Sequence, residues 1–397
     1  MEQTMEIKEL KQQFEKHFGA GGDIRIFISP GRVNMIGEHT DYNGGYVFPA
    51  ALTMRTAIAC RKRADNLIRM RATDLDVEVV ADIDKLEDYK DISWGDYQLG
   101  VADTMKKSGY DICGCDMLFD DTTPHGGGLS SSAAIEVATA LAFATFSNEK
   151  KGITEPVDMI EMAKLSQKAE HEYIGVNCGI MDQFSSAMGK KDHALFLNCR
   201  TLEFELVPLN IKGCKIVIAN TKKKRSLGDS KYNERRAECE QAVEILKEYL
   251  PSITCLADVS VADFEKYGAK IENMTVRRRA EHVIYEIDRV IRSVAALKED
   301  RIQAFGALMN QSHDSLRDLY EVTGIELDTL VEEARKIPGT VGARMTGAGF
   351  GGCTVNIVKE DAVEEFIQKV GKAYTKKTGL VAEFYVSEIG DGGHEVI

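Results

Sequence analysis

The sequence predicts a mixed α+β protein of two lobes, and three observations support this prediction. The chain has 397 residues, which exceeds the size at which a single hydrophobic core usually stops growing. Two lobes with separate cores are therefore expected. Segments with the alternating apolar pattern of strands precede segments with the three-to-four spacing of helices. Strands and helices do not alternate one by one along the chain, which argues against a regular parallel βαβ sheet.

The N-terminal part of the chain contains elements of both kinds. An amphipathic helix is expected near the N-terminus, with Leu10, Phe14 and Phe18 on one face. The glycines that come next in the sequence end this helix. Isoleucines at every second position of 24–28 indicate a half-buried strand. Further strands are expected over 56–60, 66–72, 77–80 and 194–198, and further helices over 94–108, 133–146 and 153–173.

The C-terminal part is richer in helical patterns. A short buried strand is expected over 215–218, and a helix over 230–250. Later helices are expected over 277–298, 301–319, 326–336 and 360–378, and later strands over 353–358 and 382–387. We expect an N-terminal lobe over 1–205 and a C-terminal lobe over 206–397.

Charge and composition indicate a soluble protein without a nucleic-acid or membrane partner. The 63 acidic and 50 basic side chains give a net charge of -13, which disfavours binding to nucleic acid or to an anionic membrane. The basic run over 222–225 is typical of a solvated loop. The N-terminal segment lacks the uninterrupted apolar core of a signal peptide. The apolar stretch over 133–146 is too short to cross a bilayer and contains Glu136.

The nine cysteines are scattered without paired C-x-x-C elements, and their number is odd. This usage favours reduced thiols over a disulfide framework, so we expect a cytoplasmic protein. Cys113 and Cys115 are interpreted as core or strand residues rather than metal ligands.

A glycine- and serine-rich segment precedes the apolar helix expected over 133–146. Such a junction predicts a phosphate site, because glycines admit the phosphate close to the backbone and the helix N-terminus carries a partial positive charge. The alternative is a flexible loop with a serine cap. The sequence has no Walker A or protein-kinase motif, so another nucleotide-binding design is required. The residues concerned are Gly126, Gly127, Gly128, Leu129, Ser130, Ser131 and Ser132.

The segment over 32–45 combines a cation, two carboxylates and an imidazole: Arg32, Glu38, His39 and Asp41. Carboxylates accept hydrogen bonds from pairs of hydroxyls, and an arginine stabilises phosphoryl charge, so the segment suits a polyol that is phosphorylated. A metal site formed by Glu38, His39 and Asp41 is a weaker alternative, since adjacent residues seldom converge on one ion.

A third glycine-rich segment lies over 342–352, and its glycines at 347, 349 and 352 match G-x-G-x-x-G. A dinucleotide fingerprint follows a strand and opens a helix, whereas this segment precedes the strand-like run CTVNIV. We therefore expect a glycine turn that packs against the phosphate-binding segment and closes the site. A purely structural hairpin remains an alternative.

These three segments, in this order and at these separations, resemble the three motifs of the GHMP small-molecule kinases. The sequence GRVNMIGEHTDYNGG over 31–45 resembles, apart from Met35, the signature of the galactokinase family, and the similarity continues over 175–200 and 230–240. The resemblance implies a two-lobed GHMP kinase fold, with an N-terminal lobe like ribosomal protein S5 domain 2 and a ferredoxin-like C-terminal lobe. It also implies phosphorylation of α-D-galactose at its C1 hydroxyl by ATP, the first step of galactose catabolism.

The same resemblance implies roles for single residues. Asp182 and Arg32 would be catalytic, and Ser132 and Glu170 would hold Mg²⁺. The segment from Gly126 to Ser132 would wrap the ATP phosphates. The sugar would be bound by Glu38, His39, Thr40, Asp41, Gly179, Asp182 and Tyr232.

Two other functions remain open from the sequence. Some galactokinase-like proteins sense galactose and ATP and bind a transcriptional partner without catalysis, but here the serine motif is unbroken and Arg32, Glu170 and Asp182 are present. Kinases for mevalonate, homoserine, arabinose or N-acetylgalactosamine share the phosphate motif without needing the E-H-T-D segment. We expect galactose and ATP as partners and a monomeric protein.

Overall fold

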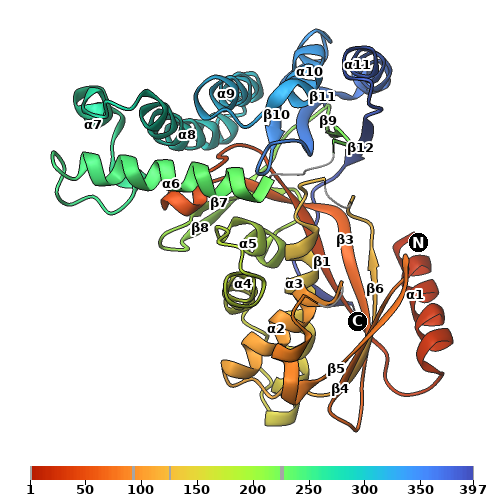
Figure 1. Cartoon of the computed structure of the whole chain (residues 1–397). Helices are drawn as coiled ribbons and strands as arrows, with labels where there is room; N and C mark the ends of the chain where they lie inside the picture. The colour runs from red at the N-terminus through yellow and green to blue at the C-terminus, as the bar shows by residue number, and fades with distance from the viewer. Residues whose placement is uncertain (1, 92–93, 125–126, 224–227, 397) are drawn as a thin grey trace.

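The computed structural model describes residues 2–91, 94–124, 127–223 and 228–396. Figure 1 shows two lobes: one contains the long N-terminal sheet with its helices, and the other contains a second sheet and a row of helices. This confirms the predicted mixed α+β fold of two lobes. The predicted boundary between residues 205 and 206 stays a prediction.

The N-terminal lobe is built on a sheet with the strand order β13-β1-β3-β6-β4-β5. Along β1, Ile26 and Ile28 pack with Phe14 of the N-terminal helix, whereas Phe27 packs on the opposite face. The two faces of the sheet therefore serve two cores, as the alternating isoleucines predict. The bounds are β1 (Arg25–Asn34), β3 (Pro49–Lys62), β4 (Leu67–Ala72), β5 (Leu75–Asp82), β6 (Cys115–Asp121), β13 (His394–Val396) and α1 (Glu2–Phe18).

Four helices cover the face of this sheet opposite α1 (Figure 1): α2 (Asp96–Lys107), α3 (Ser131–Lys151), α4 (Met159–Ala169) and α5 (Met181–Met188). The helix α3 lies against β1 and β3, and its alanine-rich surface allows this close approach. After α4, a π-helical turn over Glu170–Ile174 ends the helix. A small sheet of β2 (Tyr46–Val47), β7 (His193–Asn198) and β8 (Phe204–Pro208) follows beside α5.

The C-terminal lobe confirms the predicted ferredoxin-like arrangement. Its antiparallel sheet has the strand order β10-β11-β9-β12, and the chain passes through it as strand, helices, two strands, helix and strand. The strands are β9 (Cys214–Asn220), β10 (Thr340–Thr346), β11 (Cys353–Lys359) and β12 (Glu383–Ser387). The helices are α6 (Gly228–Leu246), α7 (Val261–Tyr267), α8 (Met274–Lys298), α9 (Ile302–Ser315), α10 (Gly324–Arg335) and α11 (Val363–Thr378).

Several elements differ from the sequence prediction. The first strand does not end at residue 28 but continues to Asn34, with a register shift between Pro30 and Arg32, so Arg32 lies on a strand. The helix expected from residue 153 begins only at Met159, because Asp158 caps it by accepting from the amides of Ile160 and Glu161. The elements that were not predicted are the strands β2, β6, β8, β10 and β13 and the helices α5 and α7.

In the described part of the chain, no helix combines the length and the hydrophobicity that a membrane span requires. All nine cysteines are free thiols. Cys115 is buried at the start of β6, which agrees with its interpretation as a core or strand residue.

Candidate active site

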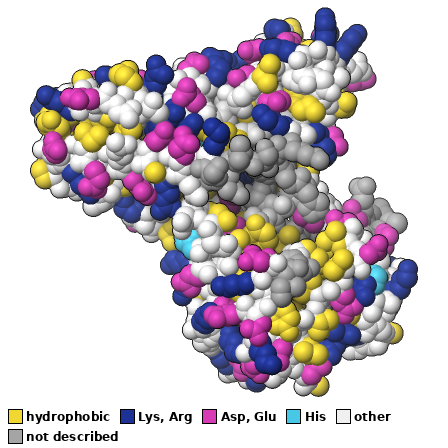
Figure 2. Space-filling model, viewed as in Figure 1, with side chains coloured by type: hydrophobic (Ala, Val, Ile, Leu, Met, Phe, Trp, Pro, Cys, Tyr) yellow, Lys and Arg dark blue, Asp and Glu magenta, His cyan; other side chains and the backbone are white. Residues whose placement is uncertain are grey.

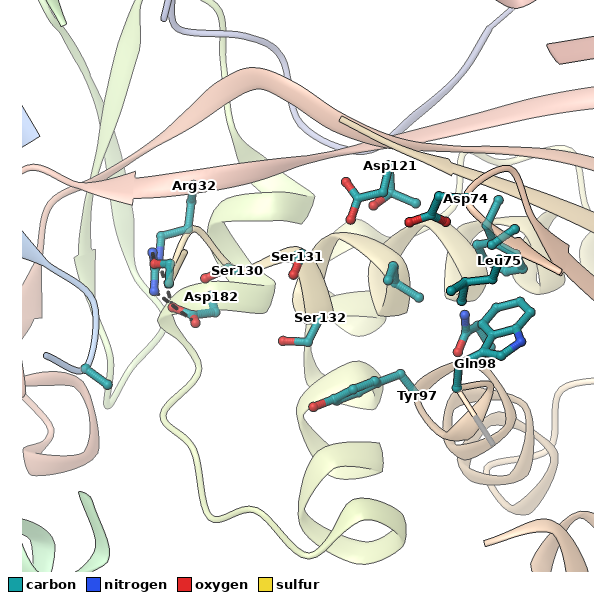
Figure 3. A pocket seen from close by; sticks show the side chains of 17 residues that line it. Arg32, Asp74, Leu75, Tyr97, Gln98, Asp121, Ser130, Ser131, Ser132 and Asp182 are labelled. Carbon is teal, nitrogen blue, oxygen red and sulfur yellow. Dashed lines mark hydrogen bonds and ion pairs between the residues drawn. The ribbon is translucent and has the colours of Figure 1, made fainter. Parts of the chain in front are cut away.

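A cavity of about 590 Å³ lies where β1, the N-terminus of α3, α5 and α2 meet. Figure 3 shows Arg32 and Asp182 at one end of it, the serines at the start of α3 beside them, and Asp74, Leu75 and Gln98 at the other end. In the space-filling view, the surface is hollowed between the two lobes (Figure 2). The predicted phosphate-binding segment, through Gly128 and the serines at the start of α3, and the polar segment over 32–45, through Arg32, therefore border one shared cavity.

Arg32 and Asp182 form a bidentate ion pair. Arg32 Nε donates to Asp182 Oδ1 at 2.8 Å, and Nη2 donates to Oδ2 at 3.0 Å (Figure 3). Arg32 is buried on β1, whereas the Asp182 side chain at the start of α5 is one-third exposed to the cavity. Burial alone lowers the pKa of the Arg32 guanidinium, but the charges of Asp182 and Glu38 outweigh this and raise it. A fixed positive charge thus holds a partly accessible carboxylate in one orientation.

The segment before α3 is attached to the same arginine. Arg32 Nη1 donates to Gly128 O at 2.9 Å, and the Arg32 amide donates to Leu129 O at 2.9 Å. Ser130 adopts a left-handed conformation with φ 59° before the helix begins at Ser131. The Ser130 hydroxyl is buried and forms no hydrogen bond within the described residues. Ser130, Ser131 and Ser132 line the cavity at the start of α3, and a helix N-terminus favours an anion there. Gly126 lies outside the described residues.

Ser132 and Glu170 are in contact. The Ser132 hydroxyl lines the cavity and hydrogen-bonds to the Glu170 carboxylate. Glu170 is only 7% exposed, so it is not the exposed helical carboxylate that its position on a helix could suggest. Burial raises the pKa of Glu170, and the charge of Asp182 raises it further.

A second buried glutamate next to this contact was not predicted as a site residue. Glu136 lies on α3 and is fully buried. It accepts a hydrogen bond of 3.1 Å from Gln183 Nε2, and burial followed by the neighbouring Glu170 raises its pKa well above the usual value. The sequence carried one signal for it, a single acidic residue within an apolar helix.

Glu38 connects the polar segment over 32–45 to the glycine-rich segment over 342–352. Its carboxylate accepts hydrogen bonds from the Gly347 amide and the Asn34 side chain, and Arg344 Nη1 lies 3.5 Å away. Burial raises the pKa of Glu38, while Arg344 and Arg32 oppose this effect. Each carboxylate oxygen of Glu38, a predicted sugar residue, thus accepts one hydrogen bond from a protein group.

His39 and Thr40 are also held by hydrogen bonds within the segment. His39 has φ 64°, and its Nδ1 lies 3.0 Å from the Tyr42 hydroxyl. Burial lowers the pKa of His39 to about 3, so the imidazole is neutral. The Thr40 hydroxyl lies within hydrogen-bonding distance of the carbonyls of Gly37 and Tyr46, 2.9 and 2.7 Å away. The side chain of Thr40 therefore stabilises the loop.

Asp41, Gly179 and Tyr232 come together although they are far apart in sequence. A Cβ atom at Gly179 would lie 1.8 Å from Asp41 Oδ2, so only glycine fits beside this carboxylate. Burial raises the pKa of Asp41 to about 7, and the charge of Asp182 adds to this rise. Tyr232 lies with its ring centroid 5.7 Å from that of His39. The structure thus brings every described residue of the predicted sugar set to one region.

The third glycine-rich segment is the turn between β10 and β11. A Cβ atom at Gly347 would lie 3.0 Å from Gly128 O, so the turn packs directly against the segment before α3. This confirms the expected contact between the two glycine-rich segments and excludes a dinucleotide fingerprint, since the segment opens no helix.

The far end of the cavity was not predicted from the sequence. Figure 3 shows Asp74, Leu75 and Gln98 at this end. The cavity is also lined by Trp94 before α2, Phe119 from β6 and Ile135 from α3. The ring of Trp94 meets that of Phe119 edge to face at 6.0 Å. Leu75, Trp94, Phe119 and Ile135 form an apolar compartment of this cavity.

The described residues contain no group of three or more His, Cys, Asp or Glu side chains that could hold a metal ion. The alternative of a metal site from Glu38, His39 and Asp41 therefore finds no support in the described structure. Any ion at Ser132 and Glu170 must complete its shell with ligands from a substrate or water.

Three family models match the chain: the galactokinase galactose-binding signature over residues 12–62, the GHMP kinases N terminal domain over 96–190, and the GHMP kinases C terminal domain over 293–376. The chain is 47% identical to the galactokinase of Bacillus subtilis (strain 168), covering 98% of this chain and 99% of that protein. It is 49% identical to the galactokinase of Fusobacterium nucleatum subsp. nucleatum, with 98% and 100% covered.

Solved structures agree with these relatives. The crystal structure of Lactococcus lactis galactokinase complexed with galactose superimposes with a TM-score of 0.92 at 39% identity, covering 98% of this chain and 100% of that one. The Methanococcus jannaschii mevalonate kinase shares the fold, with a TM-score of 0.67 at 21% identity over 94% of this chain. The chain therefore has the GHMP kinase fold and belongs to the galactokinase family.

Proposed function

We propose that the protein transfers the γ-phosphoryl group of ATP to the C1 hydroxyl of α-D-galactose, giving galactose 1-phosphate and ADP. The observation that carries the proposal is the shared cavity, which joins the Arg32–Asp182 pair to the serine-rich start of α3. Its support from relatives is the family membership and the galactose bound in the similar Lactococcus lactis enzyme.

In the proposed reaction, the galactose C1 hydroxyl lies beside Asp182. A bond forms between the C1 oxygen and the γ-phosphorus, the bond from that phosphorus to the β–γ bridging oxygen breaks, and ADP leaves. Asp182 accepts the proton of the hydroxyl. Arg32 orients Asp182 through two hydrogen bonds and stabilises charge on the transferring group.

We assign the ATP phosphates to the segment over 126–132, and Mg²⁺ to Ser132 and Glu170. The contact between the Ser132 hydroxyl and the Glu170 carboxylate provides two oxygen ligands of the kind that Mg²⁺ prefers. When bound, the ion neutralises charge on the β- and γ-phosphates. We assign the adenine base to the apolar compartment of Leu75, Trp94 and Phe119, where flat rings can stack.

We assign the sugar to the region where Asp41 meets Gly179, next to Asp182, with Glu38, His39, Thr40 and Tyr232 around it. Carboxylates and a neutral imidazole can pair with the hydroxyl groups of a monosaccharide. We further propose that the protein works in the cytoplasm as a monomer and binds neither nucleic acid nor membrane. The nine free thiols and the net charge of -13 support this proposal.

The test is product analysis with the purified protein, galactose, ATP and Mg²⁺. We expect one equivalent of ADP per galactose consumed, and a ³¹P NMR signal of an anomeric phosphate. A panel with mevalonate, homoserine, arabinose and N-acetylgalactosamine in competition tests the substrate choice. Binding of galactose and ATP without ADP release would instead indicate a sensor, and would refute the proposed activity.

A further inference from the structure

Gln98 is a buried amide at the apolar end of the cavity. It lies in the first turn of α2 and is only 2% exposed. The residues three, four and seven positions further along this helix, Val101, Ala102 and Met105, are buried in the core of the N-terminal lobe. Gln98 therefore lies on a helix face that packs inward, where a polar side chain needs a hydrogen-bonding partner.

The carbonyl oxygen of the Gln98 side chain lacks such a partner. Gln98 Oε1 is buried and forms no hydrogen bond within the described residues. The side chain lines the cavity, and Figure 3 shows it close to Leu75. The neighbouring indole of Trp94 does not supply a donor, because its Nε1 donates to Val77 O at 3.0 Å. Since an unpaired buried acceptor costs free energy, a ligand that brings a donor to this point gains affinity.

The same cavity contains the predicted phosphate site. Ser132 and Ile135 both line it, and they lie three residues apart on one face of α3. Ile135 belongs to the apolar compartment, so a nucleotide with its phosphates at the serines extends toward that compartment. The cavity volume of about 590 Å³ falls within the usual range for sites that hold a cofactor-sized ligand. We therefore expect the base of the nucleotide to lie beside Gln98.

The hydrogen-bonding groups of the base decide what Gln98 can recognise. Adenine has an exocyclic amino group at C6, which donates, and ring nitrogens next to it, which accept. A carboxamide has an acceptor and a donor side by side and can pair with both of these groups. The apolar side chains of the compartment can stack on any base, because every base has an aromatic face. Recognition of a particular base therefore needs a polar group such as Gln98.

We infer that Gln98 recognises the base of the nucleotide, with Oε1 accepting a hydrogen bond from the exocyclic amino group of adenine. The inference rests on the proposed function for the placement of the base at this end of the cavity. A rotated amide would present Nε2 to an oxygen at C6, so a base with an oxygen there does not test the inference. A base with only a hydrogen atom at C6 does, because Oε1 then stays unpaired.

The first experiment changes the ligand and leaves the protein intact. Titration calorimetry in the presence of Mg²⁺ compares ADP with purine riboside diphosphate, which has a hydrogen atom in place of the amino group. We expect the analogue to bind about three- to tenfold more weakly, the effect of one hydrogen bond. Equal affinities of the wild-type protein for the two diphosphates would overturn the inference.

The second experiment removes the amide. Gln98→Met keeps an unbranched side chain of similar length without the acceptor, so we expect the ratio of the two dissociation constants to fall to about one or to reverse. Gln368→Met on α11 is the matched control, since Gln368 is exposed and remote from the cavity, and it should keep the wild-type ratio. A wild-type ratio in Gln98→Met would show that another group recognises the amino group. The comparison in the wild-type protein stays decisive if Gln98→Met does not fold.

Both experiments measure binding, so their outcome does not depend on phosphoryl transfer. Weaker binding of the analogue without phosphorylation of galactose would refute the proposed function and leave the inference standing. Phosphorylation of galactose with equal binding of the two diphosphates would refute the inference alone. A protein that binds neither diphosphate would contradict both.

Discussion

Asp41 and Gly179 are in such close contact that a Cβ atom at residue 179 would lie 1.8 Å from Asp41 Oδ2. This contact joins the polar segment over 32–45 to the loop before α5, and Asp182 lies in the first turn of α5. The carboxylate of Asp41 has no room to move toward residue 179. The position of Asp41 in the proposed sugar site therefore depends on the absence of a side chain at Gly179.

A methyl group at Gly179 is expected to displace Asp41. Gly179→Ala should raise the galactose KM by roughly tenfold or more, since the loss of about 1.4 kcal/mol in binding corresponds to a factor of ten. Steady-state kinetics at saturating ATP measures this. Gly371→Ala, on the remote helix α11, should leave the KM unchanged. Equal KM values for the two variants would contradict the proposed role of Asp41.

Asp41 should make galactose binding depend on pH. Its pKa of about 7 means that the carboxyl is mostly protonated at pH 6 and mostly ionised at pH 8. If the ionised form accepts the sugar hydroxyls, the galactose KM should fall by about tenfold from pH 6 to pH 8. Asp41→Asn should bind galactose weakly and without this step. A wild-type KM that is flat over this range would refute the assignment.

Trp94 should report on the nucleotide. It is the one tryptophan of the chain, and it lines the apolar end of the cavity. A non-hydrolysable ATP analogue should change the tryptophan emission, because its base would stack in the compartment next to the indole. Trp94→Phe should abolish the signal. A change caused by galactose alone, with none caused by nucleotide, would place the base elsewhere.

Arg344 should be essential for stability. It is fully buried, donates to Asn34 O at 2.9 Å and to Ser312 Oγ at 3.2 Å, and lies 3.5 Å from Glu38. Arg344→Met would leave a buried carboxylate without its cation, at a cost of about 3–5 kcal/mol. Urea unfolding followed by circular dichroism measures this change. Arg292→Met, which breaks an exposed pair with Asp288, should cost less than about 1 kcal/mol. Equal midpoints for both variants would refute the prediction.

Patterns in the local sequence predicted those helices and strands that are determined by the spacing of neighbouring apolar residues. Helices such as α1 and α8 follow from apolar spacing, and Leu10 and Phe14 are buried as the spacing requires. The strand β10 was missed because its sequence contains glycine and Arg344, which suggest a turn or a surface. Arg344 is buried only because Glu38, from a segment about 300 residues away, comes to meet it.

Within the candidate site, too, some residues could be predicted from local sequence motifs and others could not. The residue types of the phosphate-binding and polar segments were visible as motifs, and the structure brings all the described ones together. The apolar compartment was not visible, because Leu75, Trp94 and Phe119 meet only through the pairing of β4, β5 and β6. The position of Gln98 in the cavity was hidden for the same reason, since long-range packing leaves no periodic signal in sequence.

The central claim is that Asp182, held by Arg32, takes the proton of the sugar hydroxyl during phosphoryl transfer. The most direct measurement compares turnover and galactose binding in purified Asp182→Asn. We expect kcat to fall by about 10²–10⁴-fold, the usual contribution of general base catalysis, while calorimetry still detects galactose binding. Turnover close to that of the wild type would contradict the account.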